Sequence, residues 1–204
     1  MTTPDILIYA SDAAPWCGPD AAMGQLLATD VPGTGALSWS FGRLCAMLGS
    51  ITVPIVGLDQ LTKLYVASRL PLYGTRAIIP NWLDLTFTLN PGAAFSLFAT
   101  LPAEAREVLF LVLSCTATVV LLVLLARRST PATSRIGFAL ILGGTIGNLI
   151  DRLARGRVVD FIYFHHDSFS YPVFNVADSA ITVGVATILV VSFLSRPAPN
   201  RSNA

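Results

Sequence analysis

Two short segments of the chain place aspartates within apolar sequence. The first, GNLIDRLARGRVVDF, contains Asp151 and Asp160, and the second, FNVADSAI, contains Asp178. Two carboxyl groups held together at low dielectric cannot both ionise, so they share one proton. One group can then act as a base toward water while the other donates a proton to a carbonyl oxygen or a leaving amine. A pair drawn from these aspartates would suit hydrolysis of an amide bond.

Other hydrolytic sets are not supported by the sequence. The histidines His165 and His166 are adjacent in one predicted loop, and no serine has a plausible histidine partner. The HHD segment at 165–167 resembles part of a metal site, but third and fourth ligands at a matching spacing are not found. We therefore expect neither a metal nor a cofactor.

Polar residues beside the aspartates indicate how they could be held. Asn148, Asp151 and Arg152 lie at i, i+3 and i+4, which predicts one shared helix face. We expect Arg152 to neutralise Asp151, which makes Asp151 the weaker candidate for a reactive group. Asn175 and Asp178 have the spacing of a helix N-cap and a first-turn acid. The same cap could also hold Asp178 ionised beside a second carboxyl group, and the two interpretations are compatible.

Two further motifs have both a structural and a functional interpretation. Asp59 and Lys63 lie at i,i+4 in an apolar segment and would form an ion pair on one helix face. A neutralised structural pair is the favoured interpretation, ahead of a direct catalytic role. Asn90-Pro91-Gly92 follows an alternating segment and indicates a turn that ends a strand.

The composition indicates a membrane protein. Of 204 residues, 53% are hydrophobic and only 12% are charged, and the net charge of +1 gives no sign of a nucleic-acid partner. Windows long enough to cross the hydrocarbon core predict four spans, near 44–66, 108–126, 136–150 and 177–194. Isolated spans satisfy their backbone hydrogen bonds as helices. We therefore predict an all-α four-transmembrane-helix bundle.

Smaller features complete the predicted bundle. Gly143 and Gly147 in the short third span form a small-xxx-small pair that would let another helix approach closely. Residues 83–89 alternate between apolar and polar types, the period of a half-buried strand. We therefore expect a small β-sheet outside the membrane, in the loop that follows the first span.

Charge and composition also predict the orientation and the domains. The arginines that follow the second and fourth spans place both termini in the cytoplasm by the positive-inside rule, although the opposite side also carries arginines. Residues 1–43 are acidic, rich in small residues and typical of a tail without a core. We expect the membrane domain at 44–195 and a polar cytoplasmic tail at 196–204. Met47 is an alternative start.

Four motifs together resemble those of the lipoprotein signal peptidase family, also called signal peptidase II. They are GLDQLTK at 57–63, TLNPGAAFSLF at 88–98, GGTIGNLIDRLARGRVVDF at 143–161 and FNVADSAITVG at 174–184. They occur in the order of the family, within about residues 44 to 195. Any one of the motifs would be weak evidence, but the ordered set is specific.

The resemblance implies an aspartic endopeptidase of the bacterial inner membrane. The family removes signal peptides from diacylglyceryl-modified prolipoproteins by cutting before the lipidated cysteine. It implies Asp160 and Asp178 as the catalytic dyad, near the outer face of the membrane. The residues implied in supporting or substrate-binding roles are Asp59, Lys63, Asn90, Gly92, Asn148, Asp151, Arg152 and Asn175. We expect a monomer whose partners are prolipoproteins and membrane lipids.

Two other classes of function are compatible with charges inside a membrane bundle. A transporter or channel could use intramembrane aspartates to relay protons, but the sequence lacks an internal repeat and its charges gather at one end of the bundle. A non-catalytic assembly factor would tolerate amidation of either aspartate. Changing Asp160 and Asp178 to asparagine distinguishes the protease from both.

Overall fold

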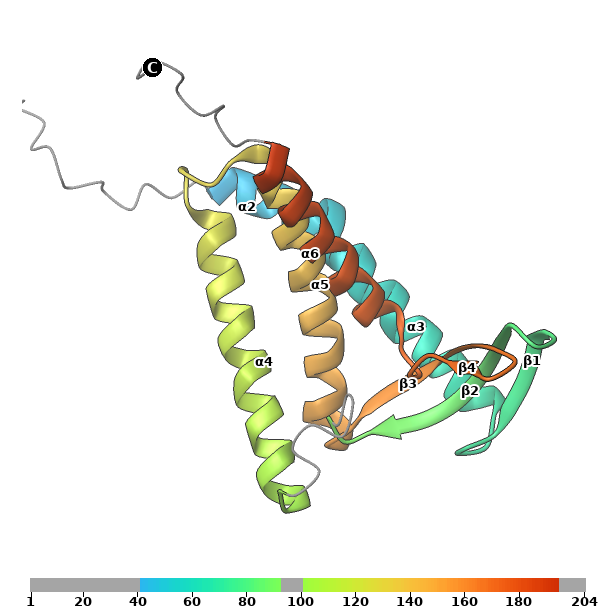
Figure 1. The fold of residues 1–204 in the computed structure, drawn as a ribbon. Helices are drawn as coiled ribbons and strands as arrows, with labels where there is room; N and C mark the ends of the chain where they lie inside the picture. Colours follow the sequence, from blue (N-terminus) through green and yellow to red (C-terminus); the bar gives the residue numbers. More distant parts are fainter. Residues whose placement is uncertain (1–40, 93–100, 195–204) are drawn as a thin grey trace, which may run out of the picture. The chain divides into compact units, whose positions relative to one another are not determined.

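The computed structural model describes residues 41–92 and 101–194, which form a helical bundle with a small sheet (Figure 1). The elements in chain order are α2 (Phe41–Met47), the π-helical turn η1 (Leu48–Thr52), α3 (Val53–Arg69), β1 (Thr75–Ile79), β2 (Leu83–Asn90), α4 (Ala103–Ala126), α5 (Ala132–Arg155), β3 (Val158–His166), β4 (Phe169–Ser170) and α6 (Val176–Leu194). The predicted tails lie outside the described residues, except that α2 already begins at Phe41.

The described residues contain four helical segments long and apolar enough to cross a membrane, as predicted. The first is continuous from α2 through η1 into α3, over Phe41–Arg69. The third was predicted to be short, but α5 has 24 residues, the same length as α4. The apolar window ends early because α5 has polar residues toward both ends. Arg135, Asn148 and Asp151 are buried there, so the helix continues where hydropathy falls.

The sheet has four antiparallel strands in the order β1-β2-β3-β4. The alternation at 83–89 correctly predicted β2, and the remaining strands were not predicted individually. In β3 the first four residues are all buried, so this strand has no polar alternation at its start. Pairing with β2 places Asp160 opposite Thr88. The sheet packs on α3 through a cluster of Val66, Val159 and Phe161.

Glycines in α5 allow two neighbouring helices to approach closely, as the small-xxx-small pair predicted. A Cβ at Gly144 would collide with the backbone carbonyl of Ala177 in α6. On the α3 side, a Cβ at Gly147 would lie 2.6 Å from Oδ2 of Asp59. The missing side chain at Gly147 therefore makes room for a carboxylate inside the bundle. This close packing brings the polar residues of α3, α5 and α6 into one cluster.

Candidate active site

Asp160 and Asp178 line the same cavity, which has a volume of about 460 Å³. Asp160 lies in β3, shortly after Gly156 ends α5 in a left-handed conformation with φ of 71°. Asp178 lies in the first turn of α6. Gly92, Phe110 and Arg152 contribute to the wall. Two segments that are separate in the sequence thus direct their carboxyl groups toward one space.

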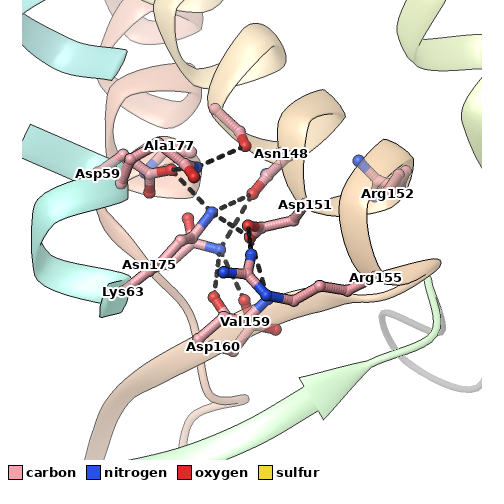
Figure 2. A network of polar contacts seen from close by, with 12 residues as sticks. Asp59, Lys63, Asn148, Asp151, Arg152, Arg155, Val159, Asp160, Asn175 and Ala177 are labelled. Carbon is pink, nitrogen blue, oxygen red and sulfur yellow. Dashed lines mark hydrogen bonds and ion pairs between the residues drawn. The ribbon is translucent and has the colours of Figure 1, made fainter. Parts of the chain in front are cut away.

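Two asparagine side chains hold the Asp160 carboxyl group. Asn175 Nδ2 donates to Oδ1 at 2.6 Å (Figure 2). Asn90 Nδ2 donates to Oδ2 at 2.8 Å. The backbone N–H of Gly92 in turn donates to Asn90 Oδ1 at 2.8 Å. Because Gly92 has a φ of +96°, the Asn90-Pro91-Gly92 segment is a true strand-ending turn. The turn also orients the Asn90 amide toward the Asp160 carboxyl group.

Asp178 is held by a reciprocal cap at the start of α6. Its backbone N–H donates to Asn175 Oδ1 at 2.9 Å, and its Oδ2 accepts the Asn175 N–H at 3.2 Å. This arrangement confirms the predicted N-cap. Oδ1 of Asp178 accepts a third hydrogen bond, from Asn148 Nδ2, at 2.8 Å. Asn175 therefore contacts both carboxyl groups, through its backbone and its side chain.

Burial of Asp160 raises the pKa of its carboxyl group to about 7, and the nearby charge of Asp178 adds to the effect. The residue is only 2% exposed. Its hydrogen bonds from Asn90 and Asn175 and the charge of Lys63 oppose the shift without cancelling it. The carboxyl group is thus poised to hold or release a proton near neutral pH.

A buried ion network supports the two carboxyl groups from behind. Lys63 Nζ lies 2.8 Å from Asp59 and 2.8 Å from Asp151, and the side chains of all three are fully buried. The predicted Asp59–Lys63 pair is therefore present. Lys63 also donates to Asn148 Oδ1 at 3.1 Å. Since that oxygen is occupied, the Asn148 amide nitrogen faces Asp178.

The carboxylates of this network also organise the backbone of the site. Asp59 Oδ1 accepts the N–H of Ala177 at 2.9 Å, in the first turn of α6. Asp151 Oδ2 accepts the N–H of Val159 at 3.1 Å, one residue before Asp160 in β3. The network thereby fixes the two backbone segments that carry the dyad. This geometry gives the Asp59–Lys63 ion pair a structural function.

The expectation that Arg152 neutralises Asp151 is wrong. Asp151 pairs with Lys63 and with Arg155, whose Nη1 lies 2.6 Å from Asp151 Oδ1. Arg152 stands apart from this network in Figure 2; its guanidinium lies over the Phe110 ring and donates to Ser114 Oγ at 3.2 Å. Because Asp151 and Arg152 are consecutive residues of α5, their side chains point in different directions around the helix. Arg152 therefore contributes positive charge to the cavity wall.

Sequence reasoning missed several residues of the site. The Asp151–Arg155 pair could have been found, because it has i,i+4 spacing. Tyr171 and Phe174 carried no such signal; their rings meet edge to face, with centroids 5.6 Å apart. They line the main cavity and also a second groove of about 510 Å³, which Asp178 reaches as well. The second groove has an apolar wall that includes Leu83, Ile162 and Val183.

Comparisons with known proteins agree with one another. Residues 51–194 match the family model described as Signal peptidase (SPase) II. The lipoprotein signal peptidase of Desulforapulum autotrophicum is 41% identical over 150 residues, covering 72% of this chain and 89% of that protein. The one from Pseudomonas putida is 42% identical over 158 residues, covering 76% and 91%. A solved structure described as a bacterial membrane enzyme has a TM-score of 0.64 at 26% identity, covering 78% of this chain and 97% of that one.

Proposed function

The chain belongs to the signal peptidase II family of membrane proteases that process lipoproteins, and we propose that Asp160 and Asp178 are its catalytic dyad. One observation carries the proposal: the two carboxyl groups line one cavity and are held by a shared asparagine, Asn175. The reaction is cleavage of a diacylglyceryl-modified prolipoprotein before its lipidated cysteine, by a water that the two aspartates activate.

In the resting dyad, Asp160 carries the proton and Asp178 carries the negative charge. With its pKa raised to about 7, Asp160 is mostly protonated in mildly acidic solution and about half protonated at pH 7. Asp178 lies at the start of α6, where the helix dipole stabilises an anion. It also accepts hydrogen bonds from Asn148 and from the backbone of Asn175. The two carboxyl groups thus have different roles because their surroundings differ.

The proposed reaction proceeds in two steps. Asp178 takes a proton from the water as the water oxygen bonds to the carbonyl carbon, and Asp160 gives its proton to the carbonyl oxygen. In the resulting gem-diol the carbon–nitrogen bond then breaks. The proton on Asp178 passes to the leaving nitrogen, and Asp160 recovers a proton from a gem-diol hydroxyl group. The dyad returns to its starting state, with one water consumed.

The surrounding residues have supporting roles in this proposal. Asn90, Asn148 and Asn175 orient the two carboxyl groups, while Gly92 and Arg152 line the space for substrate. Asp59, Lys63 and Asp151 act through the backbone and through Asn148. The apolar groove beside Asp178 offers an environment compatible with a lipid-modified substrate.

We place the protein in the bacterial inner membrane as a monomer among membrane lipids. Both termini face the cytoplasm, and the dyad lies near the outer face. The arginines between α4 and α5 support this orientation. The sheet, whose strand β3 carries Asp160, and the first turn of α6, which carries Asp178, lie away from that loop (Figure 1). A substrate already inserted in the membrane could then present its modified cysteine at the outer boundary.

Cleavage should depend on the lipid modification. Full-length protein in detergent is expected to cut a diacylglyceryl-modified prolipoprotein peptide and to leave the unmodified peptide intact. Mass spectrometry should show that the carboxy-terminal product begins with the modified cysteine. Equal cleavage of both peptides would overturn the substrate assignment, and a product that begins elsewhere would overturn the proposed cut.

The pH profile should follow the proton on Asp160. Because the pKa of this carboxyl group is raised to about 7, the protonated acid is lost as pH rises through that value. We expect kcat/KM to fall above about pH 7 and to approach a tenfold loss per pH unit, since this parameter reports the free enzyme. Initial rates between about pH 5 and pH 9 test this, with thermal melting at each pH as the control. A flat profile to pH 9 would contradict the role of Asp160 as acid.

A further inference from the structure

A buried arginine at the other end of the bundle has no acidic partner within 41–92 and 101–194. Arg135, in the first turns of α5, is only 8% exposed. Its Nη2 donates to the backbone carbonyl of Arg128 at 3.3 Å, while its Nε is buried without a hydrogen bond. None of the ion pairs among the described residues includes it. A buried charge is costly unless a counter-charge accompanies it.

The described residues supply no carboxylate to this end of the bundle. No aspartate or glutamate occurs at 31–58, 108–150 or 179–204. These stretches contain α2, the loop from α4 to α5, and nearly all of α6. In Figure 1 that loop lies with α2 and the end of α6, away from the sheet. The eight acidic residues in the described part of the chain all belong to the half that carries the site or its sheet. No carboxylate of the described residues is therefore placed to act as the counter-ion of Arg135.

The loop that surrounds Arg135 is well organised. The Thr130 hydroxyl donates to the Leu124 carbonyl at 2.6 Å and so caps the end of α4. The Thr130 N–H contacts the Arg127 carbonyl at 3.4 Å, which closes a tight turn. Arg127 follows α4 directly, and its side chain is exposed beside this turn. A second cationic side chain thus lies on the same short loop as the backbone carbonyl that Arg135 contacts.

The start of α5 adds to the positive potential of this loop. Pro131 precedes the helix and provides no side-chain cap for its first N–H groups. These groups carry the positive end of the helix dipole, which favours an anion. The planar guanidinium of arginine has a fork of donors that matches a phosphate group. The chemistry around Arg135 therefore suits a phosphate group.

We propose that the loop between α4 and α5 binds the headgroup phosphate of an anionic phospholipid, with Arg135 and Arg127 as its cationic ligands. A lipid is the fitting source because this loop joins two membrane-spanning helices, where lipid headgroups are abundant. The bound phosphate supplies the counter-charge that Arg135 lacks among the described residues. The inference is independent of the proposed catalytic residues.

The test uses full-length protein in a neutral detergent with phosphatidylglycerol or phosphatidylcholine as the probe lipid. Native mass spectrometry should show preferential retention of phosphatidylglycerol. Arg135→Gln is expected to weaken this binding about fivefold, the effect of one basic contact. Arg76→Gln is the matched control, since Arg76 is an exposed arginine in β1. It should bind phosphatidylglycerol as the unmodified protein does.

A second arginine variant and a comparison with inorganic phosphate complete the test of lipid binding. If Arg135→Gln does not fold, Arg127→Gln changes an exposed side chain and should also weaken phosphatidylglycerol binding about fivefold. Inorganic phosphate at the same concentration should give no thermal stabilisation, whereas phosphatidylglycerol should raise the melting temperature. Equal lipid binding by the arginine variants and the Arg76→Gln control would overturn the proposal. Equal stabilisation by inorganic phosphate would overturn the assignment to a lipid.

Discussion

Asp160→Asn and Asp178→Asn are each expected to lower kcat for prolipoprotein cleavage by roughly four orders of magnitude, because the activated water needs both an acid and a base. An asparagine at position 160 cannot donate an acidic proton, and one at position 178 cannot accept a proton from water. Rates with a lipid-modified peptide in detergent measure the effect. The double variant should be hardly slower than either single variant, since the two groups act as a unit.

The matched control for this experiment is Asp167→Asn. Asp167 lies outside the cavity, its side chain is 74% exposed, and it contacts Asn81 in a neighbouring turn. This variant should cleave at the normal rate. Circular dichroism and thermal melting establish whether the dyad variants remain folded. A folded Asp160→Asn or Asp178→Asn protein with normal cleavage would remove that residue from the mechanism and favour a non-catalytic function.

Lys63→Met should cause the largest loss of stability of any single change in the ion network. Lys63 is 1% exposed and faces Asp59, Asp151 and Asn148. Removing the cation leaves Asp59 without its ion-pair partner, while Asp151 keeps Arg155. Breaking a buried pair in this way costs about 3–5 kcal/mol of unfolding free energy. Denaturant unfolding in detergent, followed by tryptophan fluorescence, measures this loss.

Arg69→Met is the control for Lys63→Met, because it also replaces a cation by methionine in α3. Arg69 is exposed, and its guanidinium lies over the Tyr65 ring at 5.6 Å from the centroid. Its removal should change the unfolding free energy by less than about 1 kcal/mol. Equal stability of the two variants would show that the buried network does not hold the bundle together.

Local spacing predicted those parts of the site that lie within one helix turn. The Asp59–Lys63 pair needs only i,i+4 spacing, and the cap between Asn175 and Asp178 needs only i,i+3 spacing. The alternation at 83–89 likewise predicted β2. Such features depend on backbone geometry that neighbouring residues share. They can therefore be read from the sequence without knowledge of the tertiary fold.

Contacts between elements could not be derived in the same way. Lys63 in α3 contacts Asp151 in α5. Strand β3 pairs with β2 although both α4 and α5 lie between these strands in the sequence. Spacing alone left the choice among Asp151, Asp160 and Asp178 open, because each lies in apolar sequence. Only the tertiary structure shows that Asp151 is occupied by Lys63, Arg155 and the Val159 N–H. It leaves Asp160 and Asp178 facing the cavity.

Asn175 has a consequence for how the protein is made. This residue caps the start of α6 and also donates to Asp160, so neither carboxyl group of the proposed dyad is fully held until the fourth helix is in place. A ribosome-bound chain with only its first three helices inserted would therefore be inert. Proteolytic competence would arise late in biogenesis, after the bundle has closed, and nascent membrane proteins nearby would be spared from premature cutting.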